Sequence, residues 1–344
     1  MKRRRLVSLI VILALISGCA RVPVYTLSGR TMGTFYTLKV CGVYDGDEQD
    51  LIRMTVDSAL SRVNGCMNRY DPKSEISRFN AYSGTDTYPV SAPFMKVAVL
   101  AEKIYRASDG AFDPTVTPLV RLWGFGDDGA LQRPDPETLA SAMRHVGMNK
   151  LRISEDGIRK TDPETSLDFS AIAKGYGVDE VAEALLSLGY RDILVEIGGE
   201  VRACGDNAGR PWRIGIADPA PEKAGELSTP AAIVLRDKAC ATSGDYRQFY
   251  LVDGKRYSHL IDPKTGHPIE HELTSVTVIA ETCMLADAAA TAAIVLGKVR
   301  GQAFIESLEG VEAYFIYRED DELRTAETSA WNAYREMSQD QRKR

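Results

Sequence analysis

The sequence is poor in the residues that build metal and disulfide frameworks. Its 344 residues include four histidines and six cysteines. The cysteines are widely spaced and form no C-x-x-C pair, so the sequence gives no support to a zinc site or to a dense disulfide framework. An exported location would permit a disulfide, but the sequence does not indicate which cysteines would pair.

Basic clusters are also missing from the body of the chain. They occur only in the first few and the last few residues, and the formal net charge is -6. A protein that binds a phosphate backbone needs a basic patch or stripe. We therefore expect no nucleic acid partner.

A long hydrophobic run of membrane-spanning length is absent. The longest apolar stretch covers residues 6–16, behind the basic residues 2–5 and before Ser17 and Gly18. It is too short for a hydrocarbon core that requires about 20 apolar residues. The pattern therefore predicts an export signal rather than a transmembrane helix.

The signal ends in a pattern that resembles a bacterial lipobox, Ile16-Ser17-Gly18-Cys19. We predict a signal peptide over residues 1–18, lipidation of Cys19 and a lipidated tether over 19–28. Acyl chains contribute about 0.8 kcal/mol per buried methylene and would hold the protein at a membrane surface. The alternative is a cleaved and fully secreted protein. A main domain over 29–335 and a polar tail over 336–344 complete the organisation.

Alternating and helical patterns predict a mixture of strands and helices. Helices are expected over 51–63 and 92–107, and Asp135 with Pro136 begins another that ends at Gly147. A hairpin is expected over 153–160. The predicted strands cover residues 34–40, 192–197, 201–204, 212–217, 233–235, 239–242 and 275–280.

Two segments of the first half have the composition of a binding surface. In Thr31-Met32-Gly33-Thr34 the methionine offers a soft surface for an aromatic ring; the alternative is a strand start with a core methionine. Residues 110–126 crowd aromatics, glycines and two prolines together, which favours a shaped pocket wall. A connector whose aromatics fill the core is the alternative.

Residues 167–179 form a strand end that turns through small residues into a helix ending at Gly189. Backbone N–H groups at such a helix start, together with Lys174, favour an anion such as a phosphate. The order of residues is not that of a P-loop. A solvated lysine on an amphipathic helix is the alternative.

An alanine-rich helix is predicted over 282–296, ending at Gly297. Asp287 and Thr291 stand four residues apart on it and share one face. Hard oxygen ligands of this kind suit Mg²⁺. The surrounding alanines indicate close packing around the acid, which would otherwise be solvated.

The segment 257–268 carries His259 next to a Pro-Gly turn that begins at Asp262. Histidine titrates near neutral pH, so acid-base chemistry is possible here. The alternative is a hairpin turn with a surface histidine. Ser243-Gly244-Asp245 lacks the second glycine of a nucleophile elbow, so we do not predict a serine hydrolase.

Taken together, the motifs resemble the ApbE family, the FAD:protein FMN transferases. The resemblance extends from Thr31 to Gly297. The motifs that carry it are Thr31-Met32-Gly33-Thr34, Tyr70-Asp71-Pro72, Ser77-Arg78-Phe79-Asn80, Phe112-Asp113-Pro114-Thr115, Leu122-Trp123-Gly124-Phe125-Gly126, Ile172-Ala173-Lys174-Gly175-Tyr176, Gly198-Gly199-Glu200, Ser243-Gly244-Asp245-Tyr246, the segment 259–266, and Asp287 with Thr291.

The resemblance implies an α+β fold, a two-lobed single domain related to T-folds, with mixed or antiparallel sheets and packed helices. It implies that the substrate FAD contacts Met32, Tyr70, Ala111, Phe112, Asp113, Asp168, Lys174 and Ile261. It also implies that Mg²⁺ is held by the Ala171 carbonyl, Asp287 and Thr291. Some relatives carry a further acid where this chain has Ala290, and alanine often replaces Gly177.

The implied reaction transfers FMN from FAD to an acceptor threonine, with His259 as the base, Asp262 as its orienting partner and AMP as the leaving group. The acceptors implied are flavoprotein subunits of membrane electron-transfer complexes, and the location is the extracytoplasmic side of a bacterial membrane. Two alternatives are a lipoprotein that only binds FAD and a pyrophosphatase that splits FAD with water.

Overall fold

The computed structural model describes residues 22–125, 131–217, 219, 231–245, 249–252, 255–320 and 322–335. The predicted signal peptide, Cys19 and the tail over 336–344 lie outside these residues, as do Gly126 and Tyr246 of the motifs. None of the helices in the described ranges is both long and apolar enough to cross a membrane. All five cysteines of this part are free thiols, and four of them are buried.

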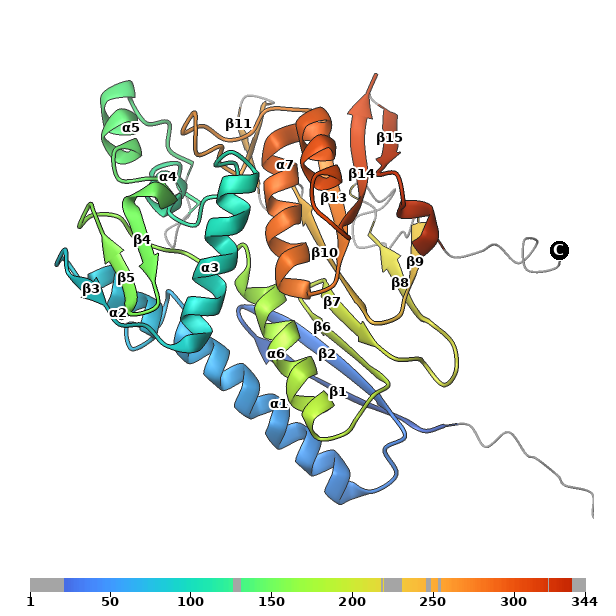
Figure 1. Ribbon diagram of the computed structural model, residues 1–344. Helices are drawn as coiled ribbons and strands as arrows, with labels where there is room; N and C mark the ends of the chain where they lie inside the picture. Colours follow the sequence, from blue (N-terminus) through green and yellow to red (C-terminus); the bar gives the residue numbers. More distant parts are fainter. Residues whose placement is uncertain are drawn as a thin grey trace, which may run out of the picture.

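The main sheet within these residues is antiparallel and has eight strands in the order β1-β2-β6-β7-β10-β13-β14-β15 (Figure 1). The strands are β1 (Val24–Thr31), β2 (Thr34–Cys41), β6 (Ile193–Ile197), β7 (Glu200–Cys204), β10 (Lys238–Gly244), β13 (Leu273–Ala280), β14 (Glu312–Glu319) and β15 (Glu322–Glu327). The antiparallel pairing and the packed helices confirm the predicted α+β class.

The first strand corrects the tether predicted over 19–28. Residues from Val24 onward form β1 and pair with β2 along its whole length, from Val24 with Cys41 to Thr31 with Thr34. Leu27 and Thr31 are buried, while the three residues between them are not. This partial alternation gives the segment a side that faces the core. Residues 24–28, the last five of the predicted tether, therefore belong to the sheet.

Helices cover one face of the sheet. α6 (Ala173–Ser187) and α7 (Cys283–Glu306) lie directly on it, and α1 (Gly46–Met67) packs against α6 (Figure 1). The other face is covered by the hairpin of β8 (Trp212–Ile216) and β9 (Ala231–Leu235) with the short helix η2 (Trp331–Tyr334). Burial on both faces explains why every residue of β13 is buried.

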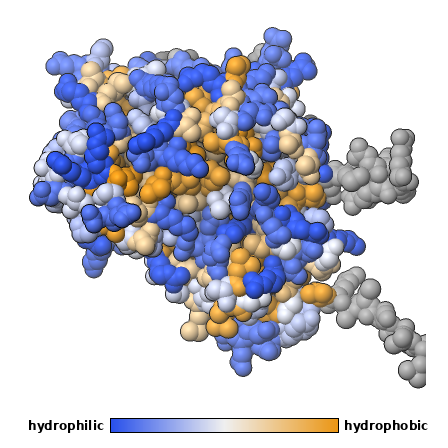
Figure 2. All heavy atoms as spheres, viewed as in Figure 1, coloured by the Kyte–Doolittle hydropathy of each residue, from blue (hydrophilic) through white to orange (hydrophobic). Residues whose placement is uncertain are grey.

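A smaller lobe stands beside α6 and α7. Its sheet has the order β3-β5-β4, and a separate hairpin pairs β11 with β12. The elements are α2 (Glu75–Ala81), β3 (Thr87–Tyr88), α3 (Ala92–Ala107), α4 (Thr117–Leu122), α5 (Pro136–Met143), η1 (Met148–Lys150), β4 (Leu151–Ser154), β5 (Gly157–Lys160), β11 (Phe249–Val252) and β12 (Lys255–Ser258). Figure 2 shows hydrophobic atoms gathered in a band across the middle of the face that carries α3 and α7.

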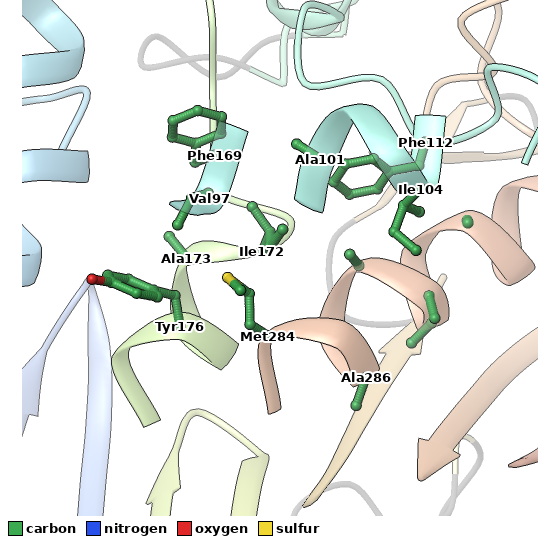
Figure 3. Close-up of a cluster of buried hydrophobic side chains, with 14 of the residues drawn as sticks. Val97, Ala101, Ile104, Phe112, Phe169, Ile172, Ala173, Tyr176, Met284 and Ala286 are labelled. Carbon is green, nitrogen blue, oxygen red and sulfur yellow. The ribbon is translucent and has the colours of Figure 1, made fainter. Parts of the chain in front are cut away.

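One continuous core joins the two lobes. Side chains of α3 meet the start of α6 and the first turns of α7, and Figure 3 shows Phe112 against Ala101 and Ile104, with Met284 directed toward Ile172. All of these side chains are almost fully buried. The lobes therefore cannot separate without exposing a large apolar surface.

The close contact of α6 and α7 depends on small residues. A Cβ atom added at Gly175 would lie 2.4 Å from the backbone oxygen of Cys283. The Asp179 carboxylate of α6 accepts hydrogen bonds from the N–H groups of Cys283 (3.0 Å) and Met284 (2.9 Å) and so caps α7. The predicted helix end at Gly297 is a break with φ 76°, beyond which helix continues to Glu306.

We predict that Gly175→Ala lowers the free energy of unfolding by about 1–3 kcal/mol, because the added methyl group meets backbone rather than a flexible side chain. Gly65→Ala in the exposed part of α1 is the matched control. A Cβ there has no neighbour within 4 Å, so alanine should stabilise the helix by about 0.5–1 kcal/mol. Urea unfolding measures both. Equal effects of the two changes would contradict the close packing described.

Candidate active site

A cavity of about 480 Å³ lies where segments from both lobes meet. Its wall is formed by the start of α6, the end of β10, one side of α7, the loop before α4 and the loop after β12. The predicted site residues that line it are Tyr70, Ala111, Phe112, Asp113, Asp168, Ala171, Lys174, His259, Ile261, Asp287 and Thr291. The fold thus brings these residues together, while their chemical roles stay predictions.

Asp287 lies at one end of the cavity and is 3% exposed. Its Oδ2 accepts a hydrogen bond from the backbone N–H of Gly175 at 3.0 Å, and its Oδ1 lies 3.8 Å from Nζ of Lys174. The alanines around it let α7 approach the first turn of α6, where backbone N–H groups have no partner within their own helix. The carboxylate is therefore stabilised by a helix N-terminus and a lysine.

Lys174 also contacts a second carboxylate. Its Nζ lies 3.3 Å from Oε1 of Glu200, which is 1% exposed and lines the same cavity. Glu200 is the first residue of β7, directly after the tight turn at Gly198 and Gly199, whose φ angles are positive. Two acids and one lysine give this end of the cavity a net negative charge, which favours a cation.

Oxygen donors complete this end. Thr291 follows Asp287 by one helical turn, and its Oγ1 lies 3.3 Å from Oγ of Ser243 on β10. Ala171, whose carbonyl was predicted as a ligand, lines the cavity just before α6. The described residues contain no group of three or more His, Cys, Asp or Glu that could hold a metal. One carboxylate with hydroxyl and carbonyl oxygens suits Mg²⁺, which keeps waters and shares substrate phosphates.

His259 reaches the cavity from the loop that follows β12. The turn after it is held by its own backbone, since Gly266 N–H donates to the Asp262 carbonyl at 2.8 Å. The Asp262 carboxylate accepts a hydrogen bond from the Lys264 N–H at 2.9 Å, and Asp262 is not among the described residues that line the cavity. The structure therefore gives Asp262 a place in the turn, and its orienting role toward His259 stays a prediction.

Asp113 is another buried carboxylate of the cavity wall. Its Oδ1 accepts hydrogen bonds from the N–H (2.8 Å) and the hydroxyl (2.5 Å) of Thr115. Thr115 in turn accepts from the N–H of Gly147 at 2.6 Å. Burial raises the pKa of Asp113 to about 6, although these hydrogen bonds act in the opposite direction. Asp113 can therefore carry a proton near neutral pH.

A carboxylate and an aromatic ring form a third part of the wall. Oδ2 of Asp168 lies 3.1 Å from Nε of Arg69, and the Arg69 guanidinium lies 4.2 Å from the centre of the Tyr70 ring. Tyr70 is 65% exposed. Because the cation holds the ring from one side, the ring offers a flat surface on which another aromatic group can stack.

Met32 is a predicted FAD contact that differs from the residues above. It occupies the turn between β1 and β2 with φ 50° and is not among the described residues that line the cavity. Its side chain packs against both main cores, and a Cβ added at Gly177 would lie 3.2 Å from its Sδ. The structure thus gives Met32 a packing position, which was the alternative interpretation, and its contact with FAD stays a prediction.

A sequence profile of the ApbE family matches residues 32–315. The chain belongs to the ApbE family. It is 38% identical to the FAD:protein FMN transferase of Haemophilus influenzae, over 98% of this chain and 100% of that protein. It is 39% identical to the FAD:protein FMN transferase of Vibrio cholerae, over 94% of this chain and 96% of that protein.

Solved structures of the ApbE family share the fold. The flavin transferase ApbE from Vibrio cholerae matches with a TM-score of 0.82 at 39% identity and covers 91% of this chain and 99% of its own. The apo form of the flavinyl transferase ApbE from Pseudomonas stutzeri matches with a TM-score of 0.82 at 37% identity, over 91% and 96%. The predicted resemblance is confirmed.

Several cavity residues of this ApbE-family chain were not predicted as site residues. Glu200 and Ser243 stood in motifs without a role, and Arg69 was not singled out. The double glycine before Glu200 was the available signal, because a tight turn fixes where the next side chain points. Among the apolar residues of the wall, Val116, Val120 and Phe125 lie in the segment 110–126 that was predicted as a pocket wall. Leu260 and Val295 carry no comparable local signal.

We predict that Asp113 makes the protein less stable as the pH rises. Its pKa is about 6 in the folded protein and near 4 in an unfolded chain. Between these two pH values the folded state binds more protons than the unfolded state, so the free energy of unfolding falls as the pH rises to about 6 and beyond. Relative to Asp113→Asn, the wild type should lose about 2–3 kcal/mol of unfolding free energy between pH 4 and pH 7. Urea unfolding at both pH values tests this, and a constant difference would contradict it.

Proposed function

We propose that the chain transfers FMN from FAD to a threonine hydroxyl of an acceptor flavoprotein and releases AMP. The observation that carries the proposal is the shared cavity, which joins buried acids, a lysine, a histidine and an aromatic wall. The relatives named FAD:protein FMN transferase cover nearly the whole chain and support it. The new bond joins the threonine oxygen to the FMN-side phosphorus, and the bond from that phosphorus to AMP breaks.

FAD binding follows from the walls of the cavity. Tyr70, Ala111, Phe112, Asp113, Asp168, Lys174 and Ile261 would contact it, and Met32 in the turn between β1 and β2 is the remaining predicted contact. The ring of Tyr70 gives a stacking surface, and Asp113 and Asp168 give directed polar contacts. A mostly apolar cavity with a few placed polar groups is the usual form of a cofactor site.

Charge at the pyrophosphate must be neutralised for the transfer. Lys174 lies between Asp287 and Glu200 and supplies one positive charge at the start of α6. Asp287, Thr291 and the Ala171 carbonyl would hold Mg²⁺. When bound, Mg²⁺ supplies positive charge beside the phosphate oxygens, which is worth several kcal/mol in such reactions.

The hydroxyl of the acceptor must lose its proton as it attacks. His259 lies in the same cavity, and a ring nitrogen of its neutral imidazole can take that proton. General-base assistance of this kind typically contributes about a hundredfold to ten-thousandfold in rate. The backbone of the turn over 262–266 keeps the loop that carries His259 in place.

The location and the acceptors belong to the same proposal. Cys19 after a lipobox-like stretch would carry the lipid that anchors the protein on the extracytoplasmic side of a bacterial membrane. Flavoprotein subunits of membrane electron-transfer complexes would then be acceptors within reach.

The proposal predicts a mass gain on the acceptor. Incubation of the protein with FAD, Mg²⁺ and an acceptor domain should add one FMN residue to a threonine, seen by mass spectrometry, and EDTA should abolish the gain. Free FMN without modified acceptor would indicate a pyrophosphatase. Bound FAD without release of AMP would indicate a protein that only binds the flavin.

We also predict that His259→Ala reduces transfer by about a hundredfold or more while FAD stays bound, because the base acts on the acceptor rather than on FAD. Transfer rates and the quenching of flavin fluorescence separate the two effects. His267→Ala is the matched control, since His267 lies in the same loop but is not among the described residues of the cavity wall. Loss of FAD binding together with transfer would give His259 a structural role.

A further inference from the structure

Asn80 is a residue that the proposed reaction does not use, although its interactions lead to the cavity. It lies near the end of α2, in the lobe beside α3. Its side-chain Nδ2 donates to the carbonyl of Leu167 at 2.8 Å, and its Oδ1 accepts from the N–H of the same residue at 2.7 Å. One amide therefore satisfies both backbone groups of Leu167, as a neighbouring strand would.

The residue held in this way precedes Asp168. The N–H of Asp168 donates to the carbonyl of Pro114 at 2.7 Å, which ties it to the wall that carries Asp113. Its carboxylate then has a fixed direction, with Oδ2 near Arg69 and Oδ1 accepting from the N–H of Ser170 at 2.8 Å. The position of the backbone before Asp168 thus decides where the carboxylate lies in the cavity.

Asn80 itself is anchored by a buried lysine. Lys160 on β5 is 0% exposed, and its Nζ donates to the carbonyls of Asn80 (3.1 Å) and Tyr82 (2.9 Å). The Nζ also lies 4.9 Å from the centre of the Phe79 ring. Burial lowers the pKa of Lys160. A buried ammonium group is costly unless its donors are satisfied, so this anchor holds the end of α2 firmly.

We propose that Asn80 is a positioning residue for FAD binding, acting through Asp168. Lys160 fixes the end of α2, Asn80 fixes the backbone of Leu167, and Asp168 is thereby presented to the substrate. The inference rests on the proposed function, because it requires that Asp168 contacts FAD. Asn80 itself is not among the described residues of the cavity wall.

The test measures the dissociation constant of FAD by flavin fluorescence without Mg²⁺, so that binding is separated from transfer. Asn80→Ala should raise this constant about tenfold, as expected for the loss of two hydrogen bonds to a buried backbone. In the transfer assay the KM for FAD should rise to a similar extent, while kcat at saturating FAD stays within about threefold of wild type. An unchanged FAD affinity in Asn80→Ala would overturn the inference.

A double-mutant cycle separates positioning from general stability. In the Asp168→Asn background, Asn80→Ala should change FAD affinity less than about twofold, because its effect passes through that carboxylate. An equal effect in both backgrounds would overturn the inference. So would an Asp168→Asn variant that binds FAD as well as wild type.

Two further variants guard against misfolding. Asn80→Asp keeps the acceptor for the Leu167 N–H and loses the donor, so it should fold and show an intermediate loss of affinity. Thr328→Val is the control for stability alone, since Thr328 is buried and accepts from the N–H of Ala313 at 2.8 Å outside the cavity wall. It should lower stability and leave FAD affinity unchanged. Wild-type protein that binds no FAD would instead refute the proposed function.

Discussion

The structure depends on the contact between the buried Asp287 carboxylate and the first turn of α6. The Gly175 N–H and the Lys174 ammonium group stabilise the negative charge, and the carboxylate holds the two helices together. A buried charge is expensive unless it is paired and hydrogen-bonded. The alanines of α7 and the missing side chain of Gly175 make this approach possible. The same feature thus serves packing and places charge in the cavity.

The sheet below these helices positions other side chains of the cavity wall around the Asp287 contact. β7 and β10 are neighbouring antiparallel strands, so Glu200 at the start of β7 and Ser243 near the end of β10 lie at the same end of the pair. The second lobe brings the wall with Asp113 and the loop before Asp168. Since a continuous core joins the lobes, the cavity between them is largely formed by the fold itself.

Local patterns were sufficient for much of the fold. The bounds predicted for α3 agree with the observed Ala92–Ala107, because Ser91 caps it and its apolar face is regular. β1 was missed because Thr, Ser, Gly and Arg interrupt its apolar residues, and only pairing with β2 reveals it. β14 and β15 were also not predicted, and the exposed, charged β15 carries little apolar signal of its own.

Many residues of the candidate site could be named from the sequence, but not all of them could be placed. Acids, lysine and histidine in the ApbE motifs could be named from the sequence, and most of them line the cavity. Asp262 and Met32 could not be placed, because a turn residue bonded to its own backbone and a packed methionine look the same in a sequence as ligand-binding ones. Arg69 and Asn80 act through partners far away in the chain, and no local pattern reports such partners.

A hydrogen bond joins the end of α4 to the turn that follows His259. The Trp123 indole N–H donates to the Gly266 carbonyl at 2.8 Å, and its ring stacks near that of Tyr257. The end of α4 and the turn after His259 are therefore coupled mechanically. Val120 on α4 and Pro263 in that turn both line the cavity, so displacing either part of the wall would break the bond that joins them.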